Sequence, residues 1–288
     1  MKGIGFIAAV LAVFIVGDTI LASSDAVSRS NLFRKNDYEK TVLSNGGRLE
    51  YDHVFYGNSV LVSAFIEEES ATDYVNFGMD YATITDLRDM LKKGMLKPKK
   101  DLVLALNYFV LLDTLDTNPT YPWHRKTIEP YVFFERDRLH KFLISEFTGL
   151  FTGQKRTIHT ELEKAVYYGV MTDEELDTKI NTHNDLFWGL DTSYYKKNLA
   201  ALKEVIKYCA DNGVRLRAIW MPWNGYTQMP EVPVEVARLA DEIMSEAEIE
   251  VYDMLDAMPR DCFHDLGHLN YEHGAHVFTQ EADKWLIN

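Results

Sequence analysis

The chain is short of cysteine, of basic residues and of long hydrophobic runs. Its 288 residues include two cysteines, Cys209 and Cys262, which is too few for a disulfide framework and gives no CxxC metal pair. We interpret both as small buried side chains or bystanders. Lysine and arginine number 30 against 44 acidic residues, and the formal net charge is -14. This charge argues against nucleic acid or an anionic lipid surface as the main partner.

One uncharged run stands at the N-terminus, from residue 3 to 17, and Asp18 ends it. Residues 4–21 are just long enough to span a tilted or thinned bilayer, as an uncleaved signal anchor would. Small residues at 22–24 fit the alternative, a cleaved signal peptide. We favour an anchor over residues 1–24. The chain is then a single-pass protein of the cell membrane, with its larger part outside the cytoplasm, although the basic residues after the run give this orientation little support.

Beyond the anchor, residues 25–48 are polar and are expected to form a membrane-proximal stalk or a first helix. From residue 49 on, short apolar runs alternate with amphipathic stretches. Strands alternating with helices predict a doubly wound α/β fold with a parallel sheet for residues 49–288. The runs that we expect to be strands are 53–57, 73–78, 101–107, 214–223 and 248–254; the clearest helices are 59–68, 83–94 and one that ends at Asn212 and Gly213.

The stretch from about 117 to 190 breaks this alternation. It is rich in aromatic and charged residues and contains no clear strand, so we interpret it as a helical insertion. The insertion either shapes a substrate site as a lid or only adds packing. The chain has no internal repeat and no low-complexity segment.

Polar or glycine residues lie at the ends of three of the expected strands or just after them. Ser59 comes after the first, Gly78 ends the second and Asn107 ends the third, while Asp265 and His268 form a short loop before the last helix. Sites in open α/β sheets form at the carboxyl ends of the strands, so we expect these five residues to meet there.

Together these residue types suit nucleophilic catalysis. Ser59 would be the nucleophile, His268 the base that takes its proton, and Asp265 the carboxylate that orients the imidazole. The N–H groups of Ser59 and Gly78 and the side-chain amide of Asn107 would bind the oxyanion.

The order of these blocks resembles the SGNH (GDSL-type) hydrolase superfamily, which carries Ser, Gly, Asn and His in four successive motifs. Ser59 in YGNSVL, Gly78 in VNFGMDYAT and Asn107 in LALNYF match the first three, and DLGHLNYEHGA, with Asp265 and His268, matches the last. The resemblance covers about 50–110 and 210–288. It departs from the family at Asn58, where the family has Asp, and in the third block, which lacks the usual Gly-x-Asn-Asp.

What the resemblance implies is a flavodoxin-like doubly wound sheet of the SGNH type and a serine acyl site without metal or organic cofactor. The DxxHLN ending and the N-terminal anchor look most like the extracytoplasmic acyl-transfer branch, with the D-alanyl transfer protein of teichoic acid modification and the alginate-type O-acetyltransferases. In that branch the acyl group (acetyl or D-alanyl type) passes to a cell-envelope glycopolymer beside a membrane-bound O-acyltransferase. Two alternatives stay open: an esterase or deacetylase with water as acceptor, and a non-catalytic partner subunit.

Two further features of the sequence have competing interpretations. His264, His268, His273 and His276 crowd near Asp265 and could instead form a metal site, but no HExxH motif accompanies them and Gly267 makes a helix there unfavourable. Trp220 and Trp223 lie at the end of the fourth expected strand. They would either line the substrate groove, where aromatic faces suit sugar rings, or plug the core.

Overall fold

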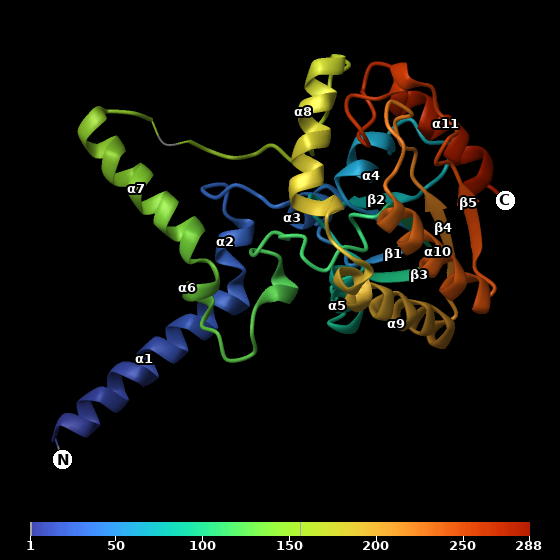
Figure 1. Ribbon diagram of the computed structural model, residues 1–288. Helices are drawn as coiled ribbons and strands as arrows, with labels where there is room; N and C mark the ends of the chain where they lie inside the picture. Colours follow the sequence, from blue (N-terminus) through green and yellow to red (C-terminus); the bar gives the residue numbers. More distant parts are fainter. Residues whose placement is uncertain (1, 156) are drawn as a thin grey trace. The chain divides into compact units, whose positions relative to one another are not determined.

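The computed structural model describes residues 2–155 and 157–288 (Figure 1). Met1, in the expected anchor, and Arg156, in the expected insertion, lie outside the described residues. The chain divides into two compact units. One comprises the N-terminal segment up to Ser44 together with Pro119–Glu163, and the other comprises Asn45–Asn118 together with Lys164–Asn288. The first part of the expected insertion therefore belongs with the N-terminal helix, and the rest belongs with the sheet.

The larger unit is built on five strands, all paired in parallel. This confirms the α/β fold with a parallel sheet that the alternating runs predicted. The strand order β2-β1-β3-β4-β5 is the order of flavodoxin-like doubly wound sheets. The strands are β1 (Glu50–Gly57), β2 (Val75–Gly78), β3 (Lys97–Leu106), β4 (Arg215–Trp220) and β5 (Glu250–Asp253).

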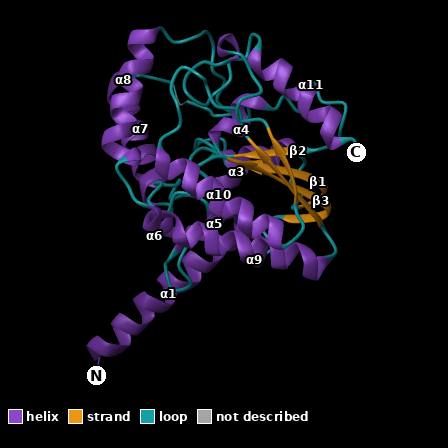
Figure 2. Cartoon of the chain, turned by 45° about the vertical axis from the view of Figure 1, so that its right-hand side comes forward, coloured by secondary structure: helices purple, strands orange, loops and turns teal. Residues whose placement is uncertain are grey.

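Helices cover both faces of this sheet. Figures 1 and 2 show α5, α9 and α10 on one face and α4 and α11 on the other. A capping box at Thr83 begins α5, and Gly213, in the left-handed conformation, ends α9 as expected. The helices of this unit are α4 (Ser59–Ala64), α5 (Ile84–Lys92), α8 (Asp173–His183), α9 (Lys196–Asn212), α10 (Glu231–Glu246) and α11 (Gly274–Leu286), with short helical turns at Asn184–Trp188 (η2), Thr192–Tyr195 (η3) and Arg260–Cys262 (η4).

The core between the sheet and α4 and α11 is apolar. Phe55 of β1, Val103 of β3 and Ile219 of β4 are fully buried there, as is Phe278 of α11. Strands buried on both faces become near-continuous apolar runs, which is why these segments were recognisable in the sequence.

The direction of winding reverses between β1 and β3. From β1 the chain passes to β2 on one side, and from β3 it passes to β4 on the other. The carboxyl ends of β1 and β3 thus form the switch point at which such sheets bind ligands. Gly57 permits a close approach here, because a Cβ at this position would lie 2.8 Å from the Cβ atoms of both Ala105 and Leu61. Asn107 follows β3 directly, and Ser59 lies two residues after the end of β1.

The smaller unit contains α1, whose segment Gly3–Ser24 is long and apolar enough to cross a membrane, as an anchor or a signal sequence would be. Its 22 residues span about 33 Å at ~1.5 Å per residue. Within this unit, Arg138 and Glu39 form a largely buried ion pair 2.8 Å long. Its helices are α1 (Lys2–Ser24), α2 (Ala26–Arg29), α3 (Asp37–Ser44), η1 (Pro122–His124), α6 (Tyr131–Phe134) and α7 (Arg136–Thr152).

Candidate active site

Ser59, His268 and Asp265 lie in a chain of two hydrogen bonds. Ser59 is the first residue of α4, and its Oγ lies 2.9 Å from Nε2 of His268. The other ring nitrogen, Nδ1, lies 2.8 Å from Oδ2 of Asp265. In the sequence, Ser59 lies 209 positions before His268, and Asp265 lies three positions before His268. The structure brings these three residues together.

These contacts fix the tautomer of His268. An ionised carboxylate can only accept hydrogen bonds, so Nδ1 of His268 must carry the proton that it donates to Asp265. Nε2 is then left with a lone pair, which accepts the hydrogen bond from the Ser59 hydroxyl. An imidazole in this state can take the serine proton, and the carboxylate behind it stabilises the imidazolium that results.

Asp265 is buried and its carboxylate is fully engaged. Oδ1 accepts the backbone N–H groups of Gly267 and His268, at 2.9 and 2.8 Å. Oδ2 accepts from His268 and also pairs with Lys179 of α8. Burial by itself raises the pKa of the Asp265 carboxyl, but the hydrogen bonds and charges of His268 and Lys179 outweigh it and hold the pKa well below its ordinary value. Asp265 is therefore ionised at neutral pH.

A tight loop presents Asp265 and His268. Its two sides meet in an antiparallel bridge between Phe263 and Leu269, both fully buried. Asn270 closes the loop, because its side chain donates to the Asp261 carbonyl and accepts the N–H groups of His273 and Gly274.

Steric crowding explains why the last motif has a glycine at position 274. A Cβ at Gly274 would lie 1.9 Å from the carbonyl oxygen of Cys262, so no other residue fits where α11 begins. The residues after DxxH in the motif thus build the frame that holds the carboxylate and the imidazole. The expectation of a helix behind this loop is confirmed by α11.

Two of the three expected oxyanion donors line a cavity at the site. Ser59 and Asn107 both border it. Among the described residues the Ser59 N–H has no acceptor, because it precedes the first hydrogen bonds of α4. Asn107 and Asn58 exchange amide hydrogen bonds of 3.0 and 3.1 Å, and the second N–H of each amide nitrogen is not used by this pair.

Gly78 is placed differently. Its N–H donates to Oδ1 of Asn76 at 2.9 Å, and within the described part of the chain it is not among the residues that border the cavity. A Cβ at Gly78 would lie 2.8 Å from Cγ2 of Val62, so the glycine lets β2 pass close to α4. In this geometry the Gly78 N–H would reach an oxyanion only after Asn76 released it.

The cavity holds about 390 Å³, within the range of roughly 300–1,000 Å³ that is usual for small-molecule sites. Ser59, His268 and Asp265, which together we call the triad, all border it. Both tryptophans expected to bind substrate, Trp220 and Trp223, border it. The ring of Tyr167 stacks on His268 with centroids 4.2 Å apart and covers one face of the imidazole.

Three residues of the site were not predicted from the sequence: Lys179, Tyr167 and Asn58. Lys179 and Tyr167 come from the expected helical insertion, which has no recognisable motif, so only the fold brings them to His268 and Asp265. In the sequence, Asn58 stands out only as a departure from the family motif. The sequence shows that Asn58 adjoins Ser59. It does not show that Asn58 pairs with Asn107, because that contact exists only when β1 and β3 lie side by side.

The cluster of histidines proposed as a rival metal site is dispersed. His268 belongs to the triad, His264 donates from Nδ1 to the Tyr168 carbonyl at 2.9 Å, and His276 pairs with Glu69 at 2.6 Å. His264 and His268 lie in the bridged loop and not on a helix.

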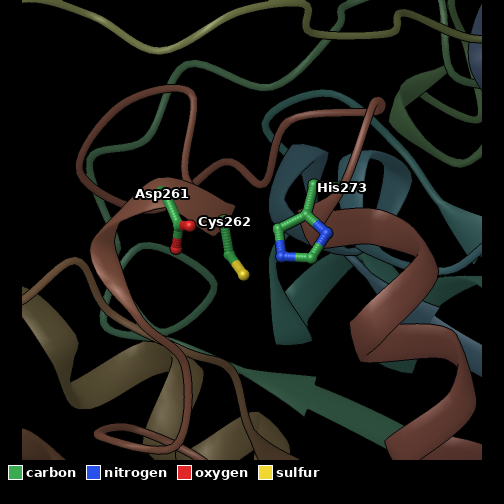
Figure 3. Close-up of side chains that lie close together, drawn as sticks. All are labelled: Asp261, Cys262 and His273. Carbon is green, nitrogen blue, oxygen red and sulfur yellow. The ribbon is translucent and has the colours of Figure 1, made fainter.

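Within the described residues, one other group could hold a metal ion: Asp261, Cys262 and His273, whose ligand atoms lie within 4.8 Å of one another (Figure 3). Burial and the neighbouring Asp261 raise the pKa of the Cys262 thiol, which favours the thiol over the thiolate that metals prefer. None of these three residues borders the cavity at Ser59.

His183 of α8 borders the same cavity and is held neutral. Burial, and after it the charge of Lys179, lower its pKa from 6.5 to about 4. A histidine whose pKa is lower in the folded than in the unfolded protein contributes stability that is complete above pH 6.5 and is lost as the pH falls toward 4. At ~1.4 kcal/mol per pKa unit, the difference between 6.5 and about 4 sets an upper bound of about 3.5 kcal/mol on the loss.

We therefore expect the melting temperature of the wild type to fall more steeply between pH 6.5 and 4 than that of His183→Phe. Thermal unfolding followed by circular dichroism across this range measures both slopes. His140→Phe, which replaces an exposed histidine of α7, should follow the wild type. Parallel curves for the wild type and His183→Phe would show that His183 is not the group responsible.

No model of a known protein family matches the chain, and no curated protein matches it. The interpretation of the site therefore rests on its own geometry: a serine, a histidine and an aspartate joined by two hydrogen bonds at the switch point of a parallel sheet.

Proposed function

We propose that the chain is a serine-dependent acyltransferase of the SGNH type, anchored in the membrane and active outside the cytoplasm. The observation that carries the proposal is the pair of hydrogen bonds from Ser59 Oγ to His268 Nε2 and from His268 Nδ1 to Asp265 Oδ2. A hydroxyl is a poor nucleophile unless a base removes its proton, and this arrangement supplies that base in the correct tautomer.

In the first half of the reaction, Ser59 Oγ attacks the carbonyl carbon of an acyl ester or thioester while His268 takes the hydroxyl proton. The carbonyl oxygen becomes an oxyanion, which the Ser59 N–H and an amide N–H of Asn107 are placed to stabilise. The intermediate collapses, His268 gives its proton to the leaving oxygen or sulfur, and the acyl group stays on Ser59 as an ester.

In the second half, an acceptor hydroxyl attacks the acyl-serine. His268 now takes the proton of the acceptor and returns it to Ser59 Oγ as the ester bond breaks. We take the acceptor to be a hydroxyl of a cell-envelope glycopolymer, with a membrane-bound O-acyltransferase as the source of the acyl group. The resemblance of the sequence blocks and the apolar α1 support this part of the proposal. No step requires a metal or an organic cofactor.

Contacts within the smaller unit support a retained anchor over a cleaved signal peptide. Asp18 of α1 accepts the Val132 N–H at 3.0 Å and lies 3.4 Å from the guanidinium of Arg125. Phe14 packs against Phe133 with ring centroids 6.3 Å apart. Cleavage after residues 22–24 would remove Asp18 and Phe14 and leave these partners uncovered. The intact mass of the chain extracted from membranes distinguishes the two forms.

The proposal is tested by giving the full chain, purified in detergent, a p-nitrophenyl acyl ester with and without a soluble oligosaccharide as acceptor. Release of p-nitrophenol together with acylated oligosaccharide, both abolished in Ser59→Ala, is the expected result. Free acid as the main product, even with the acceptor at high concentration, would make the enzyme an esterase. No turnover by folded protein would favour the non-catalytic partner subunit.

A further inference from the structure

The walls of the cavity beside Ser59 are mainly apolar and come from several elements. Phe109 follows β3, Met221 and Trp223 follow β4, and Phe187 lies in η2 after α8. Several of these rings pack against one another. The ring centroids of Phe109 and Phe187 are 5.1 Å apart, and those of Tyr108 and Trp223 are 5.8 Å apart. These aromatic side chains therefore border the same cavity as the Ser59 hydroxyl.

The polar tips of these aromatic walls are already occupied within the protein. Trp220 Nε1 donates to Asp241 at 2.8 Å and Trp223 Nε1 donates to the Thr227 carbonyl at 3.0 Å. The Tyr108 hydroxyl accepts from Trp188 Nε1 at 3.0 Å. A sugar or another polar ligand would therefore meet mainly ring faces at these walls, whereas an apolar chain would need no hydrogen-bond partner from them.

Three charged or titratable side chains of the lining are also paired or neutral. Lys179 pairs with Asp265, and burial keeps His183 neutral by holding its pKa at about 4.

The size of the cavity also bears on which acyl group fits. Its volume of about 390 Å³ equals that of roughly 13 water molecules at ~30 Å³ each, so the two carbons of an acetyl group would leave most of it unfilled.

We infer that the acyl group carried by Ser59 is an apolar, medium-length fatty acyl chain, longer than the acetyl or D-alanyl group that the sequence resemblance implies. This inference rests on the proposed acyl-serine function. The carbonyl carbon is bonded to Ser59 Oγ, its oxygen accepts hydrogen bonds from the Ser59 N–H and the Asn107 amide, and the hydrocarbon tail lies against Phe109, Phe187 and Trp223. Trp220 and Trp223 then serve the acyl chain and not a sugar ring.

The test is a series of p-nitrophenyl esters with acetyl, butyryl, hexanoyl and octanoyl chains, turned over by the full chain in detergent. Each methylene buried in an apolar site favours binding by about fourfold. We expect kcat/KM for the hexanoyl or octanoyl ester to exceed that for the acetyl ester by at least about tenfold, since not every methylene will be fully buried.

A variant locates the effect in this cavity. Ala237 of α10 borders the cavity, and Ala237→Phe fills part of it. It should lower kcat/KM for the octanoyl ester by about tenfold or more and leave the acetyl ester within about twofold. Val234→Phe is the matched control, because Val234 lies on the same helix, is 53% exposed and does not border the cavity.

Turnover of the acetyl ester without any gain for longer chains would overturn the inference and leave the proposed function standing. An equal loss for both esters in Ala237→Phe, or the same loss in Val234→Phe, would also overturn it, because the cavity would not then select chain length. Failure to turn over any ester, together with no labelling of Ser59 by a fluorophosphonate, would overturn the proposed function and the inference with it.

Discussion

Replacing Ser59 by alanine is expected to lower kcat/KM for an acyl ester by at least about 10⁴-fold. The hydroxyl that attacks the carbonyl is lost, and what remains is the slower attack of water assisted by the oxyanion donors. Ser59 is the first residue of α4 and half-exposed, and the only hydrogen bond that its hydroxyl makes among the described residues is the one to His268. The variant should therefore fold normally. The rate of p-nitrophenol release gives the measurement.

Ser63→Ala is the matched control. Ser63 lies one turn further along α4, but its hydroxyl contacts the Val60 carbonyl and the Leu269 N–H and does not reach His268. We expect this variant to retain activity within about tenfold, since it loses supporting hydrogen bonds of about 1 kcal/mol each. Equal activity of Ser59→Ala and the wild type would remove Ser59 from the mechanism.

Replacing Asp265 by asparagine is expected to lower kcat/KM by about 10³- to 10⁴-fold through the tautomer of His268. Oδ1 of Asp265 accepts two backbone N–H groups, so the asparagine oxygen would remain there and its NH₂ group would face Nδ1. An NH₂ group donates, which forces the imidazole proton onto Nε2, where it blocks acceptance of the serine proton. The magnitude is that of the corresponding change in a well-studied serine protease.

The same substitution also acts on stability. Lys179 would face a neutral amide and lose its buried carboxylate partner. Removing one partner of a buried ion pair costs about 3–5 kcal/mol, and because Lys179 is partly exposed the loss should lie below that range. Thermal unfolding of Asp265→Asn, alongside the kinetic assay, separates the two effects.

Asp261→Asn is the control for Asp265→Asn, because Asp261 is exposed and lies in the same segment without contact to His268. It should keep both activity and melting temperature near those of the wild type. If Asp265→Asn retained full activity with His268 in place, the orienting role of the carboxylate would be excluded.

Much of the fold was predictable because its signals are local. The β3 run is apolar on both faces, Thr83 and Gly213 mark helix ends by capping and by left-handed backbone, and alternation of strands and helices requires parallel pairing. The order of the strands was not predictable from such patterns alone. The division into two units was not foreseen either, since the segment 119–163 joins the N-terminal helix only through tertiary contacts.

The site was predictable to the extent that its residues follow strand ends or share one loop. Ser59, Asp265 and His268 meet as expected, and Asn107 lies at the same cavity. Lys179 could not be inferred, because a lysine in a polar helix is ordinarily a solvated surface group and 86 residues separate it from Asp265. Gly78 shows the converse: its position was foreseen, but the hydrogen bond from its N–H to Asn76 depends on a side-chain conformation that no sequence pattern specifies.

An activated Ser59 is the central claim, and covalent labelling tests it most directly. The full chain and its Ser59→Ala variant are treated with a serine-reactive fluorophosphonate, and their intact masses are measured. The account predicts a single adduct on the wild type and none on Ser59→Ala. No adduct on folded wild-type protein, or an equal adduct on the variant, would contradict the triad.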